Sequence, residues 1–302
     1  MPDLDPATLA ERVLRLSRTA PFDRMTAEEL TALAAAGREQ AFPTRTVLVN
    51  GGERASAHYV PLTGRLRLLT DRGALDATAA QSGMGVLSVL GMVPFPVDLV
   101  AEPGTVLLIL DRDALLNLLE EDGGLCRSVL RLLASKLLGL RRETPSPSSK
   151  PSSAPRVRLD LVSRMLVLRE AFGLGSGDGI AMVSRLARVT RARSFPEGSS
   201  LWTADQPADV LIVLEGSVRL NSRGIGERDA GWGEVLGLVE SVAGVPMEAN
   251  GMAIGDTTAL VLSHAELAEA IEDEDALCFE LIRSFAAQIW SRLTGRTPEL
   301  RP

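Results

Sequence analysis

Residues 38–69 read REQAFPTRTVLVNGGERASAHYVPLTGRLRLL, and residues 191–221 read RARSFPEGSSLWTADQPADVLIVLEGSVRLN. Both stretches contain a Phe-Pro step, and both end in a glycine followed by alternating apolar and basic residues. From His58 onward the two halves of the chain align without a gap at a constant offset of 152 residues. That offset superposes identical residues at Gly64/Gly216, Arg67/Arg219, Ala101/Ala253, Thr105/Thr257, Leu110/Leu262 and Cys126/Cys278. The sequence therefore predicts one domain written twice.

The chain has 302 residues, a length that suits two domains of about 150 residues each. Between the two copies, residues 144–155 read TPSPSSKPSSAP, a composition typical of a solvated, extended linker. We therefore expect a first domain with an N-terminal helix at 1–143, a Pro/Ser-rich linker at 144–155 and a second domain at 156–302.

The apolar pattern changes its period along each copy. Residues 65–68 and 217–220 alternate as half-buried strands do, and glycines separate the neighbouring short strands. Helical spacing appears at 7–18, behind the capping box Thr26–Glu29, and again after the last strand of each copy. The pattern predicts an α+β fold with two tandem antiparallel β-roll or jelly-roll barrels, each flanked by N- and C-terminal helices.

The order of these elements closely resembles the cyclic-nucleotide-binding domain. The most specific stretches are GWGEVLG at 231–237 and AIGDT at 253–257, and the same frame in the first copy reads GMGVLS at 83–88 and AEPGT at 101–105. The resemblance covers residues 20–141 and 165–293. Members of this family include catabolite-activator-type regulators and the tandem regulatory subunits of cAMP-dependent kinase.

The resemblance implies a phosphate-binding cassette in each copy. Its arginine would follow a proline and hold the phosphate with a planar fork, while a glutamate after the glycine would take the ribose hydroxyl. The arginine position holds Phe95 in the first copy and Met247 in the second. The glutamate is present in the second copy as Glu234, whereas valine, Val86, takes its position in the first copy. The candidate positions are Gly233, Glu234, Val235, Leu236, Met247, Glu248 and Ala249 in the second copy, and Gly85, Val86, Leu87 and Phe95 in the first.

An apolar residue in place of the arginine changes what the pocket can hold. Burying a phosphate without its cation would cost on the order of several kcal/mol. We expect Phe95 and Met247 to fill the vacated space as ordinary core. No cofactor is therefore expected, and the alternative of a cyclic nucleotide held by the second copy through Glu234 stays open.

The residue inventory argues against catalysis and metal binding. The two histidines, His58 and His264, do not occupy equivalent positions, so neither a catalytic triad nor a clustered metal site can be assembled. The chain has no Gly-x-x-x-x-Gly-Lys loop. Its two cysteines, Cys126 and Cys278, occupy the same position in both copies and read as reduced core thiols. We predict that the protein is not an enzyme.

Charge and apolar patterning indicate the class of partner. The net charge of −7 argues against general binding of nucleic acid, and residues 294–302 are too few for a DNA-reading helix-turn-helix. We find no apolar run of membrane-spanning length and no secretion signal, so a cytoplasmic location is expected. The helices after each barrel are strongly apolar, which favours protein partners and packing into a homodimer. The sequence thus predicts a regulatory adaptor or scaffold, with a cyclic-nucleotide receptor using the second domain as the alternative.

Overall fold

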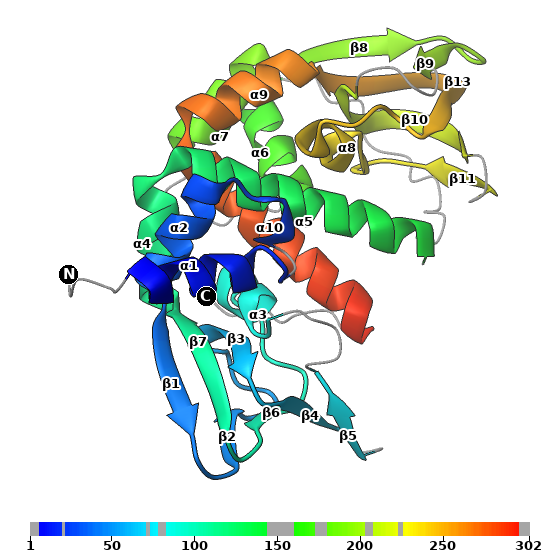
Figure 1. The fold of residues 1–302 in the computed structure, drawn as a ribbon. Helices are drawn as coiled ribbons and strands as arrows, with labels where there is room; N and C mark the ends of the chain where they lie inside the picture. Colours follow the sequence, from blue (N-terminus) through cyan, green and yellow to red (C-terminus); the bar gives the residue numbers. More distant parts are fainter. Residues whose placement is uncertain are drawn as a thin grey trace. The chain divides into compact units, whose positions relative to one another are not determined.

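The computed structural model describes residues 6–19, 22–70, 73–77, 83–143, 160–172, 180–202, 208–222 and 226–295. The described chain mixes helices with antiparallel sheets, which confirms the mixed α+β class (Figure 1). It divides into two compact units, unit 1 with Met1–Leu132 and Phe285–Pro302, and unit 2 with Leu133–Ser284. The predicted linker at 144–155 lies outside the described residues, so the domain boundaries drawn from the sequence stay a prediction.

Unit 1 opens with three helical segments, α1 (Pro6–Leu16), η1 (Phe22–Arg24) and α2 (Ala27–Ala36). Helix α2 begins with the predicted capping box, in which Thr26 and Glu29 satisfy each other's backbone N–H groups. The buried guanidinium of Arg12 on α1 donates to the carbonyls of Ala34 and Gly37 at 3.2 and 2.9 Å. Arg12 therefore ties α1 to the free carbonyls at the end of α2.

The strands of unit 1 form two antiparallel sheets. One sheet has the order β1-β7-β3 and consists of β1 (Arg38–Phe42), β7 (Thr105–Asp111) and β3 (Ala57–Thr63). The other has the order β2-β6-β4-β5 and consists of β2 (Thr46–Val49), β6 (Asp98–Ala101), β4 (Leu66–Thr70) and β5 (Gly73–Asp76). The short helix α3 (Val86–Gly91) precedes β6, and α4 (Arg112–Glu121) and α5 (Gly123–Glu143) follow β7, with the residues of α5 from Leu133 onward belonging to unit 2. The central strand β7 is an apolar run whose residues 107–110 are buried, as expected of a strand covered on both faces.

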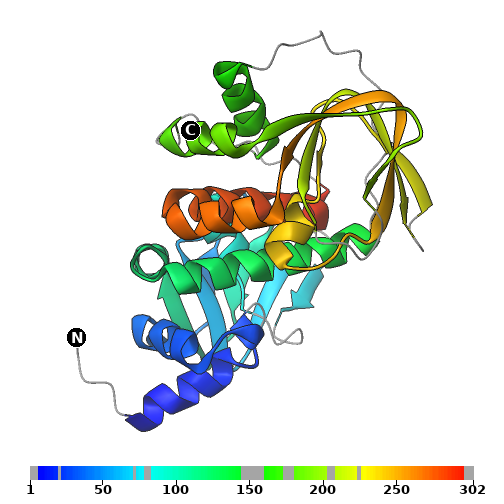
Figure 2. The same ribbon diagram turned by 90° about the horizontal axis from the view of Figure 1, so that it is seen from above.

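Unit 2 contains one six-stranded antiparallel sheet in which β10 and β13 are the long central strands. Figure 2 shows this sheet strongly curled. The strands are β8 (Arg191–Phe195), β9 (Ser200–Trp202), β10 (Val210–Ser222), β11 (Gly226–Ala230), β12 (Val235–Leu236) and β13 (Ala249–Leu262). The helices are α6 (Leu161–Ala171), α7 (Ile180–Val189), α8 (Leu238–Ala243), α9 (His264–Asp273) and α10 (Asp275–Thr294), whose last residues from Phe285 belong to unit 1.

The two units use the same strand pairing. His58 pairs with Leu110 in unit 1, and Val210 pairs with Leu262 in unit 2. In the other sheet of unit 1 Leu66 pairs with Ala101, and the pair 152 residues later, on the continuous β10–β13 ladder, is Val218 with Ala253. The first strand of each sheet also meets its partner in the same register, because Phe42 lies opposite Thr105 and Phe195 lies opposite Thr257.

A glycine and a threonine meet where this ladder bends. Gly64 and Gly216 both have φ 79°, in the left-handed region that glycine enters without strain. A Cβ atom on Gly64 would lie 2.5 Å from the Cα of Thr105, and one on Gly216 would lie 2.6 Å from the Oγ1 of Thr257. Each bend therefore requires glycine for two reasons. Its φ lies in the left-handed region, and the threonine leaves no room for a Cβ atom.

The threonine hydroxyl completes the bend. Thr105 Oγ1 accepts a hydrogen bond from the backbone N–H of Arg65 at 3.1 Å and donates to the carbonyl of the same residue at 3.0 Å. Thr257 Oγ1 donates to the carbonyl of Ser217 at 3.0 Å. Both threonines are buried, so these bonds satisfy backbone groups that the bend removes from the ladder.

We predict that Gly216→Ala lowers the free energy of unfolding by about 2–5 kcal/mol, because it combines a strained φ with a clash against Thr257. Gly198→Ala is the matched control, since Gly198 has φ 74° but nothing within 4 Å of its Cβ position. The control should lose only about 1–2 kcal/mol. Urea unfolding followed by circular dichroism measures both, and equal losses would show that the threonine contact does not constrain the bend.

Candidate functional site

The second cassette begins where the chain leaves β11. The loop at 231–234 is tied to β10, because Gly233 N donates to Val213 O at 2.8 Å and Val213 N donates to Glu234 O at 3.1 Å. Gly237 then caps α8 with φ 79°, and a Cβ there would lie 2.1 Å from the carbonyl oxygen of Asp209. The start of the cassette is therefore a fixed backbone turn that tolerates no side chain at position 237.

Glu234 holds an arginine of its own chain. Arg228 on β11 places its Nη1 atom 2.6 Å from Glu234 Oε2, and both side chains are between a quarter and a third exposed. The sequence analysis did not single out Arg228, which lies six residues before the glutamate and outside the motif frame. The carboxylate that the resemblance assigns to a ribose hydroxyl is thus engaged in an internal ion pair.

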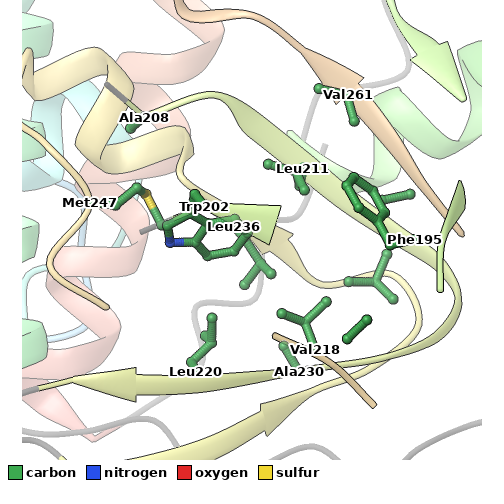
Figure 3. Close-up of a cluster of buried hydrophobic side chains, with 13 residues drawn as sticks. Phe195, Trp202, Ala208, Leu211, Val218, Leu220, Ala230, Leu236, Met247 and Val261 are labelled. Carbon is green, nitrogen blue, oxygen red and sulfur yellow. The ribbon is translucent and has the colours of Figure 1, made fainter. Parts of the chain in front are cut away.

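Met247 is 5 % exposed and lies in the hydrophobic core of unit 2. Figure 3 shows it in one cluster with the indole of Trp202 and the side chain of Leu236. The indole N–H of Trp202 donates to the carbonyl of Ala249 at 2.6 Å, which satisfies its polar atom inside the core. The cluster comprises Phe195, Trp202, Ala208, Leu211, Val213, Val218, Leu220, Ala230, Leu236, Met247, Ala253, Ala259 and Val261.

The remaining candidate positions of the second cassette surround this core. Val235 is half-buried, Glu248 is exposed and Ala249 is half-buried at the start of β13. Trp202 also presses on β13, because a Cβ on Gly251 would lie 2.7 Å from its ring. The place that a phosphate-binding arginine would occupy is apolar, and an aromatic ring packs in the same core.

The segment that the resemblance assigns to the first cassette also has a glycine at the start of its short helix. Gly85 caps α3 with φ 105°, and a Cβ there would lie 2.4 Å from the carbonyl oxygen of Ala57. Val86 and Phe95 are buried and Leu87 is half-buried. The backbone of Phe95 is paired on both sides, since its N–H donates to Glu53 O at 2.7 Å and its carbonyl accepts from Gly52 N at 2.8 Å. Phe95 is therefore a buried side chain on a backbone that is paired on both sides.

His58 is a buried polar side chain on β3, next to Tyr59, which forms an isolated β-bridge with Met84. It is fully buried, with its ring 5.2 Å from that of Phe22 and its Nδ1 atom donating to the carbonyl of Met84 at 3.0 Å. Its Nε2 atom has no hydrogen-bond partner and would lie 2.3 Å from a Cβ on Gly83. Burial lowers the pKa of His58 to about 4, so the ring is neutral in the folded protein.

We predict that His58 makes the fold acid-sensitive. Between the unfolded pKa near 6.5 and the folded pKa of about 4, the unfolded chain binds a proton that the folded chain does not. The stabilisation from the neutral ring is complete above pH 6.5 and is lost as the pH falls toward 4, a loss of roughly 3 kcal/mol. Chemical unfolding at pH 7 and pH 4 should show a smaller drop for His58→Gln than for the wild type. An equal drop in both would contradict this role.

The other titratable candidates are held by local partners. His264 Nδ1 lies 2.8 Å from Ser241 Oγ, and the backbone N–H of His264 donates to Asp209. Cys126 and Cys278 are buried free thiols, as expected from the sequence. Within the described residues no group of three His, Cys, Asp or Glu side chains could hold a metal ion. None of the described helices combines the length and the apolar character that a membrane span needs.

The recurring arginines are ion-paired on their sheets. Arg219 donates to both carboxylate oxygens of Asp229 at 2.9 and 3.1 Å, which lowers the pKa of Asp229. Arg67 lies 3.4 Å from the carboxylate of Glu102. Both pairs are part-exposed, and such pairs contribute little to stability. These ion pairs give no indication that either arginine binds a phosphate.

Residues 192–274 match a family model described as the cyclic nucleotide-binding domain. The match runs from β8 to the end of α9 and includes both Glu234 and Met247. It confirms the predicted resemblance for this stretch of the second copy. A search of curated proteins finds no match to the chain.

A comparison with solved structures finds matches of low sequence identity. The regulatory domain of Toxoplasma gondii PKA with cAMP is 17% identical, and the alignment covers 90% of this chain and 96% of that chain with a TM-score of 0.35. The regulatory subunit of a cAMP-independent protein kinase A from Trypanosoma cruzi, bound to guanosine, is 14% identical, with 90% and 87% covered and a TM-score of 0.37. The N-terminal domain of a transcriptional regulator from Streptomyces coelicolor is 21% identical, with 40% and 88% covered and a TM-score of 0.34. At these scores nothing about ligand or partner is transferred to this chain.

Proposed function

We propose that this chain is a non-catalytic regulatory adaptor built from two tandem cyclic-nucleotide-binding-like domains whose cassettes no longer hold a nucleotide. The observation that carries the proposal is the burial of Met247 and Phe95, the two residues at the phosphate-binding position, in apolar surroundings. The family match at 192–274 supports the domain type for the second copy.

The tandem arrangement rests on the repeated ladder. Strand pairs recur at the same offset of 152 residues that aligns the sequences, and the Gly64–Thr105 contact recurs as Gly216–Thr257. Independent domains would have no reason to share a positive φ, a buried threonine and a register at matching positions. These features support two copies of one β-roll.

Nucleotide binding by unit 2 would carry two costs. The ligand would have to displace Met247 and Trp202 from a packed core, and core packing resists even small changes of volume. Its phosphate would also lack a cation from Arg228, because Glu234 already engages that arginine. An unpaired buried phosphate loses on the order of several kcal/mol, most of the free energy of an ordinary small-ligand site.

Partner binding needs an exposed surface. The helices after the strands, α5 and α10, expose few of their apolar side chains. Apolar residues of α5 and α10 that the sequence analysis assigned to a homodimer, such as Leu133, Leu137, Phe285 and Ile289, are buried within the single chain. The homodimer stays a prediction. Exposed apolar side chains occur instead on α6 and at the start of α7, at Leu161, Val162, Leu166 and Ile180. We infer that these helices carry the partner contact.

Calorimetric titration with cAMP, cGMP and cyclic dinucleotides tests the proposal directly. We expect no binding at ligand concentrations up to about 1 mM, where an intact site would saturate. Micromolar binding that disappears in Glu234→Ala would overturn the adaptor and establish the alternative, a receptor using unit 2. The family match is the observation behind that alternative, and Arg228→Ala, which frees the Glu234 carboxylate from its ion pair, should be titrated beside it.

A substitution at position 247 tests whether the core is filled. Met247→Arg should lower the free energy of unfolding by about 3 kcal/mol or more, because it buries an unpaired charge. The matched control Met247→Leu keeps the volume and should lose less than about 1.5 kcal/mol. Unfolding in urea measures both variants. Full stability of Met247→Arg would mean that the position opens to solvent and that the cassette retains space for a ligand.

A further inference from the structure

Part of the last helix packs on the first cassette. Val93, Ala287 and Trp290 form a separate hydrophobic cluster within unit 1, and each is at most 8 % exposed. Gly91, the last residue of α3, faces the same helix, because a Cβ there would lie 3.1 Å from both the Cβ of Ala286 and the backbone nitrogen of Ala287. The small residues at Gly91, Ala286 and Ala287 allow the two helix backbones to approach closely.

This contact carries a buried polar group without a partner. The indole N–H of Trp290 is buried and has no hydrogen-bond partner, whereas the buried indole of Trp202 donates to Ala249 O at 2.6 Å. A buried donor that loses its bond to water is costly, and the cost is recovered when the group returns to solvent. The docked position of Trp290 is therefore less favourable than the apolar contact alone would make it.

The backbone beneath the contact is strained as well. Met92, between Gly91 and Val93, has φ 52° and is the one non-glycine residue with positive φ among the described residues. A left-handed angle is unfavourable for a residue with a Cβ, and surrounding contacts must hold it in place. The strain and the unpaired indole thus meet at the same short segment of unit 1.

We propose that Phe285–Thr294, the end of α10, is a releasable cover over the end of α3. The docked state hides Gly91 and Val93 under an Ala-Ala pair and a tryptophan one helical turn later. Release frees the indole N–H for water. It also exposes the apolar site at Gly91 and Val93, which fits a helix that carries two small residues and an aromatic one. The inference concerns unit 1 alone, so it goes beyond the proposed adaptor function and does not depend on whether unit 2 binds a nucleotide.

Hydrogen exchange on the full chain, followed by mass spectrometry, tests the cover. A released helix end of ten residues is too short to stay helical by itself, so release exposes its amides. We expect amides at 287–290 to exchange at least about 100-fold faster than those of β10, through opening that leaves the sheets intact. Exchange of both segments at one common rate would overturn the proposal, because the cover would then open only with the whole fold.

Two substitutions with opposite expected signs sharpen the test. Gly91→Leu inserts a side chain against Ala286 and should speed exchange at 287–290 at least about 10-fold, while Gly139→Leu, on a helical glycine with nothing within 4 Å, should leave it unchanged. Trp290→Phe removes the unpaired N–H and keeps an aromatic ring, so it should slow exchange at 287–290 about 10-fold. Faster exchange in Trp290→Phe would show that the indole stabilises the contact, and the releasable cover would be excluded even if Gly91→Leu unfolds the chain.

Discussion

The contact between a left-handed glycine and a buried threonine fixes the geometry on which each sheet depends. Gly216 turns β10 out of its regular ladder, and the Thr257 hydroxyl replaces a backbone bond that the turn breaks. The bend lets one continuous strand pair with β13 on both sides of the irregularity and brings the cassette loop back against β10. A strand without this bend would leave the cassette loop without the backbone partners at Val213 that hold it.

The sequence predicted the parts of the fold that rest on local chemistry. The capping box at Thr26–Glu29 and the two reduced core thiols, Cys126 and Cys278, follow from residue type and spacing alone, and the structure has both. It did not predict the partner of Glu234 or the ring of Trp202 inside unit 2, because both depend on contacts between strands. The burial of His58 was missed for a related reason, since a single histidine has no periodic pattern that reveals its surroundings.

The apolar helices show why hydropathy alone does not identify an interface with a second chain. Hydrophobic residues on almost every face of α10 exceed what one sheet requires, and an interface with a second chain is the simplest reading of such an excess. Phe285, Ile289 and Trp290 are nevertheless buried in a single chain, and Leu293 is the exposed large hydrophobic residue of this helix. Hydropathy reports that a surface must be covered, but it does not report whether the cover comes from the same chain.

The polar side chains near the two candidate cassettes differ in the partners that the structure gives them. In unit 2 the indole of Trp202 and the ring of His264 both have partners, and Glu234 has its arginine. Among the described residues of unit 2, these three side chains near the candidate cassette are held by partners in the same unit. In unit 1 the Nε2 atom of His58 and the indole N–H of Trp290 lack partners, and Met92 is strained. A buried polar group without a hydrogen-bond partner and a strained backbone angle persist only where surrounding contacts hold them. Movement of the elements around α3 would relieve both free-energy costs.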